Sequence, residues 1–152
     1  MPSRIRAGHR ERIMQDRPTA IELLEAAADF VDREIVAATQ GRVQFQSRVA
    51  ANVMRIVARE IQMEDRLVRN EVRALAQLLG HPEPHLGGLD DLHKAAAELG
   101  KELSEKIRAG QADAGGWREQ VLAVVRQAVE DKLRIANPRY VEADLAARKA
   151  SH

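Results

Sequence analysis

Apolar residues recur along this chain at the three- and four-residue spacing of α-helices. Hairpin dipeptides between alternating runs are missing and aromatic residues make up only 3% of the chain, so strands are not expected. We expect an all-α fold, an up-and-down bundle of about five helices, because short connections favour antiparallel neighbours. The expected helices are 19–38, 45–63, 64–79, 92–107 and 117–137.

Capping residues indicate where these helices begin and end. Thr19 followed by Glu22 has the spacing of a capping box, in which each side chain bonds the other residue's backbone. Gly41 suits a left-handed turn after the first helix, and Glu64 with Asp65 could open the third helix at the positive end of its dipole. The other ends are predicted from Gly80, from Asp90 or Asp91 as an N-cap, from Gly110 and from Asn137.

The second expected helix carries polar residues on its apolar face. At about 100° per residue, Asn52 lies at the edge of the apolar stripe and Glu60 near its centre. We expect this helix to turn Asn52 and Glu60 toward neighbouring helices. A buried polar group needs a partner, so an inward Glu60 predicts a basic neighbour such as Lys132 or Arg108. The stripe itself consists of Phe45, Val49, Val53, Ile56 and Val57.

The polar set on this helix, Arg48, Asn52, Arg59 and Glu60, has two interpretations. It could hold an anionic or carbonyl ligand in a bundle groove, with Glu60 available as a base. It could instead tie the helix to other elements. We favour the structural interpretation, because a bundle interior must satisfy such groups in any case.

A proline-set turn follows the fifth expected helix. Asn137, Arg139 and Tyr140 surround Pro138 there and could contact a ligand or a partner, although a helix stop explains the same residues. Trp117, which opens that helix, is expected to anchor the core or its edge.

The loop after the third expected helix is rich in residues that can ligate metals. Its histidines and acids match no metal-binding spacing, and two prolines stiffen the backbone between them, so we expect no metal site. The residues concerned are His81, Glu83, His85, Asp90, Asp91 and His93.

Composition restricts the compartment and the partners. The net charge of +1 favours neither nucleic acid nor a membrane surface, and the chain has no cysteine for disulfides or thiolate chemistry. No apolar run is long enough to span a bilayer, and no secretory signal precedes the first helix. We therefore expect a cytoplasmic protein without cofactors.

Three regions are expected along the chain. Residues 1–16 hold four arginines and little apolar periodicity, which indicates a flexible basic leader, and Met14 could be the true start. Residues 17–140 form the helical bundle domain. Residues 141–152 form a frayed or helical tail.

Four sequence runs together resemble a bacterial family that is a domain of unknown function, over residues 16–140. They are Arg-Pro-Thr-Ala at 17–20, Phe-x-x-Arg-Val-Ala-Ala-Asn at 45–52, Ile-Val-Ala-Arg-Glu at 56–60 and Asn-Pro-Arg-Tyr at 137–140. The resemblance implies genes often encoded beside acyl-CoA dehydrogenases and kinases similar to aminoglycoside phosphotransferases. It implies no catalytic residue.

The sequence favours a non-catalytic accessory protein over an enzyme. Phosphate loops, nucleophile elbows and dinucleotide fingerprints are all missing. Such a protein would bind an acyl-CoA dehydrogenase or small-molecule kinase, encoded by a neighbouring gene, through a helical face. Formation of a homodimer is a further possibility. The alternative is a bundle that binds an acyl or carboxylate ligand through Arg48, Asn52, Glu60 and Arg139, and an enzyme with Glu60 as general base is a third reading.

Overall fold

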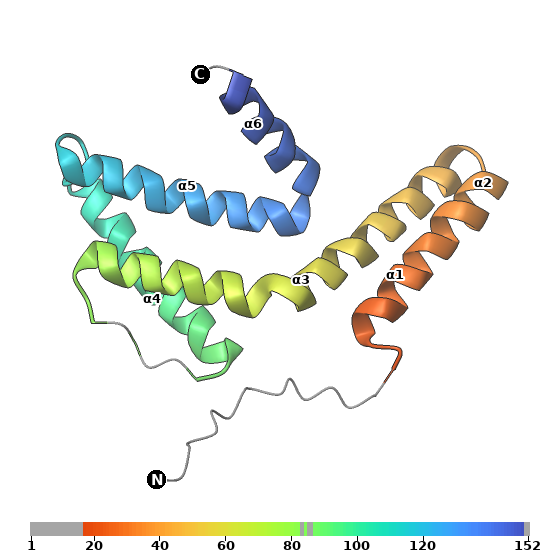
Figure 1. The fold of residues 1–152 in the computed structure, drawn as a ribbon, viewed down its shortest axis with the longest axis horizontal. Helices are drawn as coiled ribbons and strands as arrows, with labels where there is room; N and C mark the ends of the chain where they lie inside the picture. The colour runs from red at the N-terminus through yellow and green to blue at the C-terminus, as the bar shows by residue number, and fades with distance from the viewer. Residues whose placement is uncertain (1–16, 83, 85–86, 151–152) are drawn as a thin grey trace, which may run out of the picture. The chain divides into compact units, whose positions relative to one another are not determined.

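The computed structural model describes residues 17–82, 84 and 87–150, and every regular element within them is helical (Figure 1). The all-α class is thereby confirmed. The elements are α1 (Ala20–Phe30), a π-helical turn η1 (Val31–Ile35), α2 (Val36–Ala38), α3 (Gly41–Leu79), α4 (Leu89–Arg108), α5 (Gly116–Ala136) and α6 (Pro138–Ala150). The first three form one continuous helix, so the described chain contains five helices. Their number matches the expectation, but two of the expected helices are joined in α3, and α6 is an additional one. The expected basic leader, residues 1–16, lies outside the described residues.

The chain divides into two compact units, Met1–Ala58 and Arg59–His152. In the described part of the first unit, the α1–α2 helix and the start of α3 form an antiparallel helical hairpin (Figure 1). The predicted capping box opens it. Thr19 N donates to Glu22 Oε2 at 2.7 Å, and Glu22 N donates to Thr19 Oγ1 at 3.2 Å.

Side chains close the turn of the hairpin. Thr39 Oγ1 donates to the carbonyl oxygen of Ile35 at 2.6 Å, and Gln44 Nε2 donates to that of Val36 at 3.0 Å. These bonds satisfy carbonyl groups that the helix end leaves without intrahelical partners. Gly41 has φ +62°, so the predicted left-handed glycine is confirmed.

Helix α3 is a single element of 39 residues, and the helix boundary predicted at Glu64 is wrong. Residues 42–79 contain neither glycine nor proline, so nothing in the backbone stops the helix there. Asp65 does not open a helix but pairs within one, since its Oδ1 atom lies 3.0 Å from Arg69 Nη2, one turn later.

Parts of α3, α4 and α5 enclose the core of the second unit. Leu75, Leu103 and Val121 form its centre, and Trp117 packs against them. The indole Nε1 of Trp117 donates to the carbonyl oxygen of Leu78 at 3.4 Å. The expected anchoring role of Trp117 is therefore confirmed.

The ends of α4 and α5 follow the sequence signals in part. Gly88, not Asp90 or Asp91, occupies the N-cap of α4, and the two aspartates lie in its first turn, where they suit the helix dipole. Asn137 caps α5 as expected, and its N–H donates to the carbonyl oxygen of Leu133 at 2.6 Å. Pro138 then begins α6, a position that proline tolerates because its missing N–H has no helical partner.

Candidate functional site

The apolar stripe predicted as a core face lies largely on the outside of the hairpin. Phe45 is 67% exposed, Val49 46% and Val53 50%. We call these three residues the outer stripe. Large contiguous apolar patches on the surface of a monomeric protein often mark interaction sites. The outer stripe is therefore the first candidate for a functional surface.

The opposite face of α3 explains this orientation. Ala51 and Ala58 are buried, at 0% and 3% exposure, and they lie four residues before and three after Arg55 on the same helical face. Arg55 reaches across to α1, so this alanine face is the one that packs against α1, where Ala28 is also buried. Small side chains let two helices approach closely. The larger residues are left outside.

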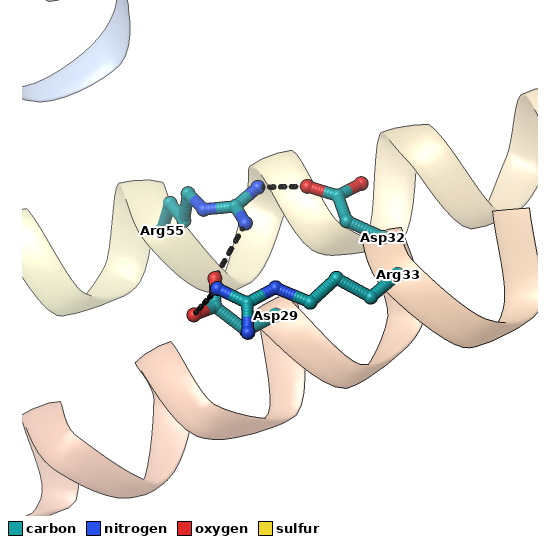
Figure 2. Close-up of polar contacts among 4 residues, drawn as sticks. All are labelled: Asp29, Asp32, Arg33 and Arg55. Carbon is teal, nitrogen blue, oxygen red and sulfur yellow. Dashed lines mark hydrogen bonds and ion pairs between the residues drawn. The ribbon is translucent and has the colours of Figure 1, made fainter. Parts of the chain in front are cut away.

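Arg55 ties the two helices of the hairpin together through a pair of carboxylates (Figure 2). Its Nη1 donates to Asp32 Oδ2 at 2.6 Å and its Nη2 to Asp29 Oδ1 at 3.0 Å. The bond to Asp32, followed by the bond to Asp29, raises the pKa of Arg55 above its ordinary value. Arg33 adds a 3.5 Å contact to Asp29. The cluster stabilises the hairpin register.

Arg48 and Asn52 lie beside the outer stripe on α3. Both side chains are exposed, and neither has a hydrogen bond or ion pair with the described residues. The expectation that Asn52 is buried against another helix is wrong. The polar residue at this position is solvated, because the face that carries it is not the packed face.

The other predicted polar residues belong to the second unit. Arg59 Nε donates to the carbonyl oxygen of Ile135 at 2.7 Å, which connects α3 to the end of α5. Lys132 Nζ lies 3.0 Å from Glu71 Oε1, so Lys132 pairs with Glu71 instead of the expected Glu60. Glu71 lies three helical turns after Glu60 on α3 and meets α5 at the level of Lys132.

The turn between α5 and α6 holds the last three predicted residues. The carbonyl oxygen of Asn137 accepts from the backbone N–H of Tyr140 at 3.1 Å. Arg139 is exposed, and Tyr140 is 59% exposed. This geometry has the helix-stop features expected of Asn137, and the role of Arg139 and Tyr140 as a contact surface stays a prediction.

One small cavity collects several charged groups of the second unit. We call it the acidic cavity, and its volume is about 190 Å³. His93 Nε2 lies 2.9 Å from Glu64 Oε1, and the buried Asp131 accepts hydrogen bonds from Gln127 at 3.0 Å and from Arg134 at 2.9 Å. Glu60 also lines the cavity but is exposed and has no such partner among the described residues, so the expected inward orientation of Glu60 is wrong. The lining residues are Glu60, Glu64, Leu67, Val68, Glu71, His93, Ala128, Asp131, Lys132 and Ile135.

The acidic cavity does not suit the expected carboxylate ligand. Four carboxylates line it against one lysine and one histidine, so an anion would meet like charge. Arg139 and Asn52 are not among the lining residues. Its volume is also below the several hundred Å³ of ordinary ligand pockets.

The histidines and acids for which we expected no metal site lie in and near the α3–α4 loop. Among the described residues, no group of three metal-ligating side chains comes together. His81 Nε2 lies 2.7 Å from Glu102 Oε2, and this hydrogen bond lowers the pKa of Glu102. Glu83 and His85 lie outside the described residues.

Within the described helices, none combines the length and apolarity that a bilayer crossing requires.

A family described as a domain of unknown function, DUF6285, matches residues 37–140, which is more than half of the chain. The chain belongs to this family. The comparisons with curated proteins and with solved structures give no match. The matched residues contain all of α3, α4 and α5, and therefore both the outer stripe and the acidic cavity.

Sequence reasoning missed the Arg55 cluster and misplaced the outer stripe. Asp29 at the end of α1 and Asp32 in η1 stand three residues apart on one continuous helix, which marks one acidic face, and Arg55 is the arginine of α3 within reach of it. The spacing of the two aspartates predicts the contact with Arg55 only when the register of the two hairpin helices is already known.

Proposed function

We propose that this chain is a non-catalytic interaction protein of the cytoplasm that binds a protein partner through the outer stripe. The exposure of Phe45, Val49 and Val53 carries the proposal. Three apolar side chains at successive helical turns form the kind of surface that another helix covers. Solvent contact of such a face costs free energy that a partner would recover.

The proposed partner is an acyl-CoA dehydrogenase or a small-molecule kinase. This choice rests on the resemblance to bacterial genes that stand beside those enzymes, and on no contact in the structure. A catalytic role is less well supported, because Glu60, the proposed base, is exposed and has no hydrogen bond or ion pair among the described residues that would orient it.

A matched pair of valines tests the proposal. Val53 on the outer stripe and Val129 on α5 are both 50% exposed. Purified chain would be mixed with each candidate enzyme, and complex formation would be followed by gel filtration and calorimetry. Val53→Ser and Phe45→Ser should weaken binding at least tenfold, whereas Val129→Ser should not. Equal affinity of all three variants, or no binding of either enzyme, would overturn the proposal.

The second candidate is a small-molecule binding bundle, which the acidic cavity supports. Its apolar lining, Leu67, Val68, Ala128 and Ile135, suits a short alkyl chain, and its four carboxylates suit a cationic head group instead of the carboxylate expected from the sequence. Hexylamine, with hexanoate as the control of opposite charge, would be tested by thermal shift. A shift with hexylamine that Ala128→Leu removes would favour this candidate over the first.

A further inference from the structure

The first half of α3 is uniformly basic. From Gly41 to Arg59 it contains four arginines and neither aspartate nor glutamate. Two of these are engaged, since Arg55 binds Asp29 and Asp32, and Arg59 donates to a backbone carbonyl group. The remaining two, Arg42 and Arg48, are exposed.

Arg42 and Arg48 border the outer stripe. Each stands three residues from Phe45, one before it and one after it, so both guanidinium groups are helical neighbours of that ring. Neither has an ion pair or hydrogen bond with the described residues. A partner that covers the outer stripe therefore meets two uncompensated positive charges.

We propose that the outer stripe binds an acidic amphipathic helix of a protein partner, with its apolar residues on Phe45, Val49 and Val53 and its carboxylates on Arg42 and Arg48. This inference rests on the proposed function and specifies the partner's chemistry. Anchors at i, i+4 and i+8 suit helix-on-helix packing. Complementary charges at the rim fix the register and speed association.

A second copy of the chain fits this surface poorly. A two-fold pairing of the outer stripe with itself would bring the arginines of both copies together. Helix α1 does expose Leu23 and Phe30, with Glu34 four residues after Phe30. That face lies opposite Ala28 on α1, on the other side of the hairpin from the outer stripe. If α1 of one copy bound the outer stripe of the next, the contacts would repeat from copy to copy and form an open chain of molecules instead of a closed dimer.

Two peptides test the inference. They are synthetic amphipathic helices of the same length with leucine at the same positions, flanked by glutamate in one and by lysine in the other. Fluorescence anisotropy with the full chain should show at least tenfold tighter binding of the glutamate peptide, and the preference should weaken as salt screens the charges. The double variant Arg42→Glu, Arg48→Glu should reverse the preference.

Control variants separate this inference from the proposed function. Arg66 and Arg126 are exposed outside the hairpin, and Arg66→Glu with Arg126→Glu should leave the preference unchanged. Circular dichroism would establish that each variant folds. If Phe45→Ser abolishes binding of a candidate enzyme but Arg42→Glu, Arg48→Glu does not, the proposed function stands and the acidic helix is wrong.

Other occupants would also overturn the inference. Self-association that Phe45→Ser removes would identify a second copy as the occupant. Binding of transfer RNA or of vesicles with anionic lipid, lost in the double arginine variant, would identify a phosphate surface. Equal binding of the two peptides would exclude a role for the arginines.

Discussion

Arg59 and Ile135 stand 76 residues apart in the sequence and are joined by a 2.7 Å hydrogen bond from Nε to a backbone carbonyl oxygen. The acceptor lies in the last turn of α5, where carbonyl groups lack intrahelical partners, so a single guanidinium both satisfies an orphan acceptor and complements the negative helix end.

The first prediction concerns this bond. Arg59→Ala should lower the free energy of unfolding by about 1 to 2 kcal/mol, since a charged donor to a half-buried carbonyl group is lost. Urea denaturation measures the change. The neighbouring Glu60→Ala serves as control and should alter stability by less than about 0.5 kcal/mol, because Glu60 is exposed. Equal effects would show that the bond contributes nothing.

The second prediction concerns the Arg55 cluster. Arg55→Met should destabilise the hairpin by about 0.5 to 1 kcal/mol, because the pairs are partly solvated, and Asp32 then loses its cation while Asp29 keeps only the exposed Arg33. Amide hydrogen exchange in α1 would report the loss, and it should shrink at high salt. Arg33→Met removes an arginine whose side chain is 77% exposed and should change little. A salt-independent effect would argue for lost packing instead of lost charge.

The third prediction concerns pH. The hydrogen bond with His81, helped by the charges of His81 and Lys106, lowers the pKa of Glu102 in the folded chain. The unfolded chain therefore binds more protons near the ordinary glutamate pKa, so this stabilisation is present above about pH 4 to 5 and is lost as pH falls through the lowered value.

Melting curves of the wild type and of Glu102→Gln between pH 3 and 6 test whether the stabilisation by Glu102 is lost on acidification. The variant should lose less stability on acidification than the wild type. Glu105→Gln, an exposed carboxylate on the same helix, should follow the wild-type profile. A steeper loss in Glu102→Gln would contradict the prediction.

The fourth prediction reverses a sequence-based expectation. With Asn52 buried, Asn52→Leu would have cost about 1 to 3 kcal/mol through stranded partners. The exposed side chain has no described partner, so the substitution should change stability by less than about 0.5 kcal/mol in urea denaturation. A loss above about 1 kcal/mol would place Asn52 in a contact that the structure lacks.

Helix content followed from sequence because periodicity depends only on local spacing. The end of α2 at Ala38 and the cap at Asn137 matched glycine and capping signals. The false boundary at Glu64 arose because acidic residues suit both a first turn and an interior i,i+4 pair, and Asp65–Arg69 is the latter.

Which face of α3 is packed could not be predicted from the same pattern. Hydrophobicity pointed to Phe45 and Val53, whereas close helix approach selected Ala51 and Ala58. The Arg55 bonds depend on the hairpin register, which local spacing does not encode. Sequence reasoning therefore assigned Phe45 and Val53 to the packed face of α3, whereas the structure exposes them.

The alanine seam of Ala28, Ala51 and Ala58 has an evolutionary consequence. A larger residue there would force the helices apart, so we expect the fold to keep these residues small. The large apolar residues that face solvent are not constrained by helix packing, and their identity can change when the partner's surface changes. Among relatives, variation at Phe45, Val49 and Val53 should therefore track the identity of what they bind, while the seam stays small.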